Sequence, residues 1–280
     1  LIWSRLGERT ATLISGWTAI GFVISLAISY GDLVGGNVLT AWFLEHFDVT
    51  GRGGATWVRR NAGSILVIAP ELWNWNVAGA NLLLWPMLLL MTLVGDGRFW
   101  KAMLLVCSLL AVAVTLQSVH ATSLIALGVG AVLFVLAKSY PRTAVGLVMT
   151  GFVVSAVAVA PLVTYAHSTL RLHHATWVPR TLQARFVIWN HTAEQIPQAP
   201  LIGIGANSTK YWRLRNEIAR KRTGHWQDST VNNHAHNYFL QAWFELGALG
   251  ALLFTAAGLS TLKLISSMQS RAQPFAVATA

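Results

Sequence analysis

The sequence predicts an all-helical protein that crosses a membrane several times, and three observations lead to this prediction. Hydrophobic residues make up 54% of the 280 residues and charged residues only 11%, whereas soluble domains carry about 25% charged residues. Several apolar runs approach the roughly 20 residues that a helix needs to cross a bilayer. These runs recur along the whole chain, which excludes a signal peptide followed by a soluble domain.

Six stretches are long and apolar enough to be predicted as spanning helices. Pro86 predicts a kink in the second of them. The third and fourth form a helical hairpin whose tip carries Ser118 and His120. In chain order the predicted spans are residues 11–30, 77–94, 102–117, 121–137, 144–165 and 237–265.

The segments between the spans divide the chain. Residues 31–61 are an amphiphilic loop, and residues 64–75 are apolar but too short to cross, so a re-entrant segment or half-helix is expected there. Three regions follow: transmembrane helices with short loops (1–165), a large loop between the last two spans (166–235), and a final span with a polar tail (236–280).

Basic residues in the short loops predict the orientation. They cluster at alternate ends of the spans, which places them all on one side of a six-span protein. The positive-inside rule makes that side cytoplasmic, and the large loop then lies outside. The basic residues concerned are Arg5, Arg9, Arg98, Lys101, Lys138, Arg142, Lys263 and Arg271.

The large loop is itself strongly basic, with nine Lys and Arg residues against three acids. Long loops escape the positive-inside rule, so this charge needs another reason. Guanidinium groups suit phosphate because their planar fork donates two hydrogen bonds. An anionic lipid-linked substrate and membrane lipids are therefore the expected partners, and no nucleic acid is expected. For Lys210 to Arg222, a solvated basic stretch lying on anionic headgroups is the alternative.

Polar residues that include His234 and His236 immediately precede the last apolar run. His236 could accept a proton from a sugar hydroxyl near neutral pH, and the alternative is a histidine that caps the helix or is hydrogen-bonded at the membrane interface. His234 and His236 could together chelate a metal, but no nearby carboxylate or cysteine completes a site, so no metal is expected. The lone Cys107 excludes a disulfide within the chain.

Other residues in these segments are also functional candidates. Glu245 lies within the apolar run, where an acid is a functional candidate by default, although pairing with a helix end is the alternative. Asn237 could cap the helix or orient its neighbour. Arg185 lies in a half-apolar setting, and residues 200–205 (PLIGIG) predict a tight turn.

Together these segments resemble the O-antigen ligase and O-antigen polymerase family. The family signature is similar to residues 235–241 (AHNYFLQ), followed by Glu245-Leu246-Gly247 and Gly250. The segment preceding the signature is similar to Arg185 with Trp189 and then PLIGIG. Arg185 precedes His236 by 51 residues, which also fits the family. The resemblance covers about residues 102–265 and is most specific after Arg185.

The resemblance implies a GT-C-like helical bundle in the bacterial inner membrane, with its site on the periplasmic face. Such enzymes transfer a glycan from undecaprenyl pyrophosphate to an acceptor and use neither a metal nor a cofactor. The favoured branch is the ligase, whose acceptor is lipid A–core. Carried over, His236 is the base that activates the acceptor hydroxyl, and Arg185 binds the pyrophosphate as it leaves, with Asn237 and Glu245 in support.

Two departures from the family pattern affect these expectations. The family often has Ser-Arg at the hairpin tip, whereas this chain has Ser118-Val119-His120. His120, Arg59 and Arg60 are the candidates to replace that arginine at the donor pyrophosphate. Family members also usually have more spans, and the sequence starts with Leu1 rather than methionine. Amino-terminal helices are therefore expected to precede it.

Several alternatives remain open on the sequence. A polysaccharide polymerase or a protein O-oligosaccharyltransferase would use the same donor with another acceptor. A flippase for lipid-linked glycans would need charges inside the spans, and the predicted spans are nearly free of charge. A non-catalytic scaffold would not need His236. The catalytic interpretation predicts that His236 and Arg185 face one cavity at the outer leaflet, on the same side as Ser118 and His120.

Overall fold

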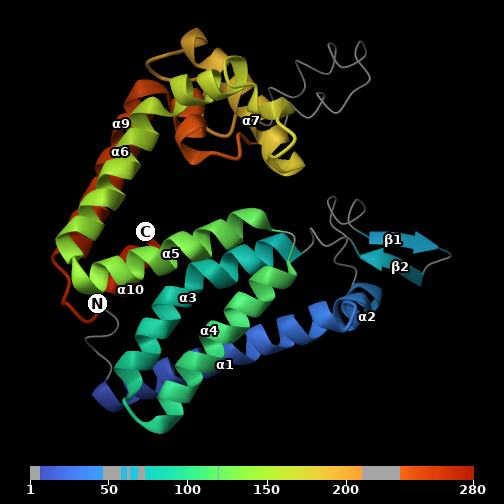
Figure 1. Cartoon of the computed structure of the whole chain (residues 1–280), viewed down its shortest axis with the longest axis vertical. Coiled ribbons are helices and arrows are strands. Elements are labelled where there is room, and N and C mark those ends of the chain that lie inside the picture. Colours follow the sequence, from blue (N-terminus) through green and yellow to red (C-terminus); the bar gives the residue numbers. More distant parts are fainter. Residues whose placement is uncertain (1–6, 47–57, 62–63, 69–72, 119, 210–233) are drawn as a thin grey trace. The chain divides into compact units, whose positions relative to one another are not determined.

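The computed structural model describes residues 7–46, 58–61, 64–68, 73–118, 120–209 and 234–280 (Figure 1). Within them, six helices are long and apolar enough to cross a membrane, which confirms the six predicted spans. They are α1 (Glu8–Val34), α3 (Asn74–Val94), α4 (Arg98–Gln117), α5 (Ala121–Ser139), α6 (Pro141–Ser168) and α9 (Tyr238–Ser266). Arg5 and the basic stretch Lys210 to Arg222 lie outside the described residues.

The segments between α1 and α3 differ from the prediction. The expected half-helix is wrong for the first part of residues 64–75, because β2 (Ser64–Ile68) pairs antiparallel with β1 (Val58–Asn61). Its sequence, SILVI, is rich in the β-branched residues that suit a pleated strand. Part of the predicted loop 31–61 is the helix α2 (Val38–His46).

A buried acid fixes the start of α2. The Asp32 carboxylate, 4% exposed, accepts hydrogen bonds from the backbone N–H groups of Leu39 and Thr40 at 2.7 and 3.0 Å. The Thr40 hydroxyl donates a third at 2.6 Å. These bonds satisfy N–H groups that a helix start leaves without partners, so α2 is tied to the end of α1.

The chain forms two compact units, one of residues 1–144 with 268–280 and one of residues 145–267. In the first unit, α1, α3 and α4 lie against one another (Figure 1), and their apolar side chains form a common core. Its buried side chains include Leu26 of α1, Met91 of α3 and Cys107 of α4, each at most 2% exposed. The two units have separate cores.

The carboxyl end is structured, in contrast to the predicted polar tail. Residues Gln273–Thr279 form α10, which packs against α5 and α3 of the first unit. Phe134 of α5 stacks on Trp85 of α3 and meets Phe275 of α10 edge-on, with ring centroids 5.3 and 4.8 Å apart. The apolar residues that follow Pro274 explain why this segment is buried.

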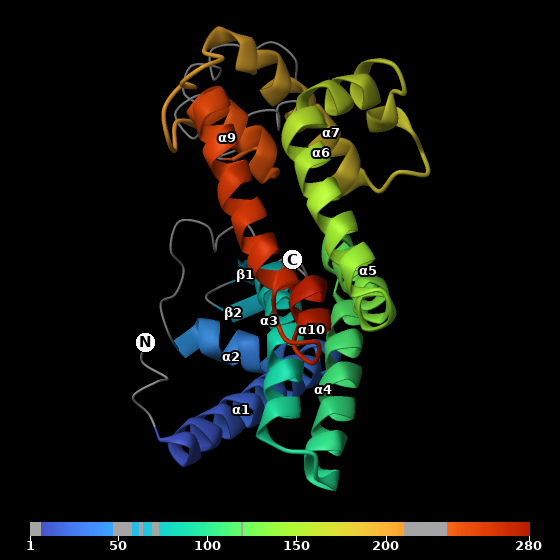
Figure 2. The same ribbon diagram turned by 90° about the vertical axis from the view of Figure 1, so that its left-hand side faces the viewer.

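The second unit is built from α6, α7 (Arg180–Gln195) and α9, and Figure 2 shows α6 and α9 running alongside each other. Aromatic side chains join these two helices. Phe152 of α6 contacts Phe239 and Phe254 of α9, and the Trp243 indole donates to the Ala156 carbonyl at 2.7 Å. The described part of the predicted large loop thus includes a helix, α7, that shares a core with α9. Short 3-10 turns, η4 (Leu172–His174) and η5 (Ile196–Gln198), flank α7.

Candidate active site

His236 is held in a strained backbone conformation just before α9. Its φ angle is 52°, in the left-handed region that residues with a Cβ seldom adopt. Ala235 on one side is 1% exposed in the core. On the other side, Asn237 caps α9, since its Oδ1 accepts from the N–H groups of Phe239 and Leu240 at 3.0 and 3.2 Å. The backbone is thus anchored on both sides while the His236 side chain is exposed. Such strain is typical of functional sites.

Arg185 and His236 come together although 51 residues separate them. Arg185 lies in the first half of α7, which packs against α9. Partial desolvation lowers the pKa of His236 to about 4, and the neighbouring charges of His234 and then Arg185 lower it as well. The two rings of His234 and His236 are 4.0 Å apart and edge-on. The imidazole of His236 is therefore unprotonated at neutral pH and lies within the field of a guanidinium.

The PLIGIG turn is inserted into a break in α9. At Gly247 the backbone leaves the helical conformation, with φ 64° and ψ −165°. The bonds that a continuous helix would form from Ala248 to Phe244 and from Leu249 to Glu245 are open there. The turn replaces them with four bonds: Ile204 and Gly205 N–H to the Phe244 and Glu245 carbonyls (3.1 and 2.9 Å), and Ala248 and Leu249 N–H to the Pro200 and Leu201 carbonyls (2.8 and 3.2 Å).

Two glycines make this insertion sterically possible. A Cβ at Gly247 would collide with the backbone of Leu201 and Gly203, and a Cβ at Gly203 would collide with the backbone of Glu245. Both glycines also have positive φ angles, which glycine adopts without a steric penalty. The PLIGIG turn and the segment around Gly247, which are separate along the chain, therefore pack directly against each other.

Glu245 fastens the end of the turn. Its carboxylate is 7% exposed and accepts from the N–H groups of Asn207 and Thr209 at 2.8 and 3.1 Å and from the Thr209 hydroxyl. The Gln241 side-chain amide donates a further bond at 3.2 Å. These hydrogen bonds give Glu245 a structural role, and its supporting role in the reaction stays a prediction. Its partners Asn207 and Thr209 carry no recognisable signal in the sequence.

The remaining predicted donor-site residues belong to the first unit. His120 precedes α5, and its Nδ1 lies 2.6 Å from the Ser123 hydroxyl. Arg59 and Arg60 lie in β1, at a register irregularity opposite β2. Arg185, His236, Asn237 and Glu245 belong to the second unit, so the assignment of His120, Arg59 and Arg60 to the same site stays a prediction.

A histidine cluster near α7 was not singled out by the sequence. His173 lies between His167 and His174, with ring centroids 3.9 and 4.0 Å away. Burial, followed by the charges of His167, His174 and Arg171, lowers the pKa of His173. In the part of the chain that the structure describes, no group of three or more His, Cys, Asp or Glu side chains is arranged to hold a metal ion.

The segment that contains these motifs matches a known protein family. A profile described as O-antigen ligase matches residues 103–255, more than half of the chain. The chain belongs to the O-antigen ligase family. The match includes Arg185, the PLIGIG turn, His236 and Glu245, and it excludes Arg59 and Arg60.

Individual relatives match a shorter part of this O-antigen ligase family member. A protein of Rickettsia felis named "Putative polysaccharide ligase" is 33% identical over 87 residues. A Rickettsia conorii protein with the same description is 32% identical over 88 residues. Each match covers 31% of this chain and 21% of the relative, so the chain matches about a fifth of the length of these curated relatives. Family membership and six apolar helices together fit a multi-pass membrane protein.

Proposed function

We propose that this protein is a membrane glycosyltransferase that moves a glycan from undecaprenyl pyrophosphate to the hydroxyl group of an acceptor. The observation that carries the proposal is that α7 packs against α9 and brings the guanidinium of Arg185 within electrostatic range of the His236 imidazole, which is unprotonated at neutral pH. Transfer from a diphosphate needs a base beside the acceptor oxygen and positive charge beside the leaving group. This pair provides both groups, and family membership supports the same chemistry.

Each residue has one role in the proposed reaction. His236 removes the proton from the acceptor hydroxyl as its oxygen bonds to the anomeric carbon of the donor sugar. The bond between that carbon and the pyrophosphate oxygen breaks, and Arg185 binds the pyrophosphate that leaves. A bound pyrophosphate would also raise the pKa of His236, because a nearby negative charge favours the imidazolium. The base is therefore unprotonated before the donor binds and a stronger proton acceptor afterwards.

Apolar side chains next to the α9 break suit the polyprenyl part of the donor. Leu201 and Ile202 of the inserted turn are 67% and 71% exposed, and Leu249 just beyond the break is 58% exposed. Exposed apolar groups at such a position are compatible with contact to a lipid chain. The site is proposed to lie on the periplasmic side of the bacterial inner membrane, with lipid A–core as the acceptor.

The test is glycan transfer in vitro by the complete purified protein. The donor is a synthetic undecaprenyl-pyrophosphate glycan, the acceptor is lipid A–core, and a chelator is present. His236→Ala should lower kcat by about 10²–10⁴, the range for loss of a general base. Arg185→Lys should also be impaired, because an ammonium lacks the planar fork that binds phosphate. His174→Ala is the matched control, since His174 is an exposed histidine of the same unit.

Three outcomes would decide against this proposal. Full transfer by His236→Ala would remove the base from the mechanism. Extension of the donor glycan by itself, without transfer to lipid A–core, would identify a polymerase that uses the same chemistry. A protein hydroxyl as the preferred acceptor would identify a protein O-oligosaccharyltransferase.

A further inference from the structure

The first unit contains a cavity of about 340 Å³ where the ends of α3, α4 and α5 meet the start of α10. Lys101 of α4 and Lys138 of α5 lie at the same end of the α4–α5 hairpin, opposite to its tip. The third cation, Arg271, comes from the turn before α10. The basic residues that line the cavity are Lys101, Lys138 and Arg271, and its acid is Asp96.

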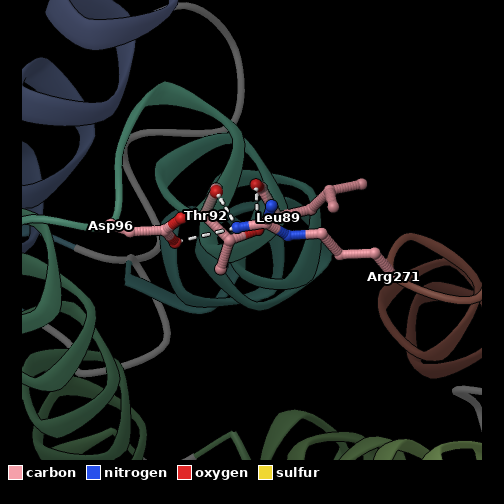
Figure 3. Close-up of polar contacts among 4 residues, drawn as sticks. All are labelled: Leu89, Thr92, Asp96 and Arg271. Carbon is pink, nitrogen blue, oxygen red and sulfur yellow. Dashed lines mark hydrogen bonds and ion pairs between the residues drawn. The ribbon is translucent and has the colours of Figure 1, made fainter.

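Arg271 is fixed in place by the end of α3 (Figure 3). Its Nη2 donates to the Thr92 carbonyl at 2.5 Å and to the Asp96 carboxylate at 3.0 Å. The Thr92 carbonyl is among the last four of α3, which have no partner within the helix. A cation at this end also interacts favourably with the negative end of the helix dipole. The guanidinium of Arg271, held by these bonds, thus lines one side of the cavity.

The cavity retains positive charge after this pairing. Asp96 is bonded to Arg271, so it does not neutralise the two lysines. Lys138 lies over the Phe134 ring, 5.9 Å from its centroid, which places its ammonium above an apolar surface. Neither lysine has an ion-pair partner among the residues described. The surplus of cations therefore favours an anionic ligand.

The rest of the lining is apolar and adjoins the spanning faces of the helices. Leu104, Phe134 and Phe275 line the cavity, and the nearby Leu105 and Val135 are 61% and 65% exposed on α4 and α5. An anion that binds here would have apolar surface directly beside it. Basic pockets between the ends of transmembrane helices are typical sites for anionic lipid headgroups.

We propose that this cavity binds the phosphate headgroup of an anionic phospholipid, with the acyl chains lying on the exposed faces of α4 and α5. Lys101 and Lys138 contact the phosphate, and Arg271 closes one side. The positive-inside orientation would place this lipid in the cytoplasmic leaflet. The site belongs to the first unit and does not depend on the proposed reaction of His236 and Arg185.

The test is native mass spectrometry of the complete purified protein titrated with phosphatidylglycerol, with phosphatidylcholine of the same chains as the neutral comparison. Lys101→Gln and Lys138→Gln should each weaken phosphatidylglycerol binding about fivefold, and the double variant about 30-fold. Binding of phosphatidylcholine should not change. Lys263→Gln is the matched control, because Lys263 lies in the last turn of another spanning helix, α9, and does not line the cavity.

Three results would overturn the proposal. The double variant would bind phosphatidylglycerol as tightly as the wild type, or Lys263→Gln would weaken it equally. Alternatively, inorganic phosphate would displace the lipid completely, which would identify a site for a soluble anion. The temperature of unfolding of each variant, expected to match the wild type, separates loss of binding from loss of folding.

Discussion

At the scale of single residues, the surroundings of His236 control its pKa. Its pKa is lowered to about 4 first by partial desolvation and then by His234 and Arg185. A base acts only when unprotonated, so activity is lost as the pH falls through its pKa. Because its pKa is lowered, His236 of the free protein stays unprotonated, and so able to act as a base, down to a lower pH.

The variant His234→Ala tests this control. Removing the neighbouring ring and its charge should raise the pKa of His236 toward its ordinary value. The acid limb of kcat/KM should then move to higher pH, while activity on the alkaline plateau stays unchanged. The measurement is the pH profile of glycan transfer, with His174→Ala as the control. An acid limb that stays in place, or moves to lower pH, would contradict this role of His234.

At the scale of elements, α9 is two half-helices joined through the PLIGIG turn. Two helical hydrogen bonds are exchanged for four bonds to the turn. A helix break at membrane depth is tolerated where neighbouring protein satisfies the freed backbone groups. The turn fulfils that condition and ties the segment after α7 to the helix that follows His236.

Gly247→Ala should destabilise the protein. The backbone conformation alone costs a non-glycine residue about 1–3 kcal/mol, and the new Cβ would collide with the inserted turn. A lower temperature of unfolding and reduced transfer activity are the expected results. Gly151→Ala in α6 is the control, because a Cβ there meets open space. Equal stability of the two variants would show that the turn is not inserted as described.

Glu245→Gln should loosen the turn without unfolding α9. A glutamine offers one acceptor oxygen and adds an N–H₂ group facing the N–H donors of Asn207 and Thr209. Loss of hydrogen bonds to a charged group costs about 1.5–3 kcal/mol each. Hydrogen exchange should become faster at Asn207 and Thr209. Unchanged exchange there would mean that the carboxylate is not what holds the turn.

At the scale of the whole molecule, the six spans and the basic residues at their alternate ends lead to a prediction about topology. The two ends of α5, Ala121 and Ser139, should face opposite sides of the membrane. In a Cys107→Ser background, a membrane-impermeant maleimide added to spheroplasts should label Ala121→Cys directly and Ser139→Cys only after permeabilisation. Labelling of both from outside would contradict the span, and labelling of Ser139→Cys alone would reverse the orientation.

The sequence by itself predicted the features that depend on local composition. The six spans follow from the length and hydrophobicity of single stretches, and α9 carries its own cap in Asn237. His236 and Arg185 were identified because the residues around them match a family signature. The helix α2 was not predicted, because the side chain that caps it, Asp32, lies on the preceding helix.

Only the tertiary structure decided which of these segments meet. The insertion of the PLIGIG turn into α9, the packing of α7 on α9 that brings Arg185 within electrostatic range of His236, and the burial of α10 against α5 all join residues distant along the chain. The physical reason is that such contacts depend on backbone hydrogen bonds and packing between segments, and these leave no periodicity in either segment. The sequence thus determined the membrane-spanning framework and the candidate groups, and the tertiary contacts determined the site that they form.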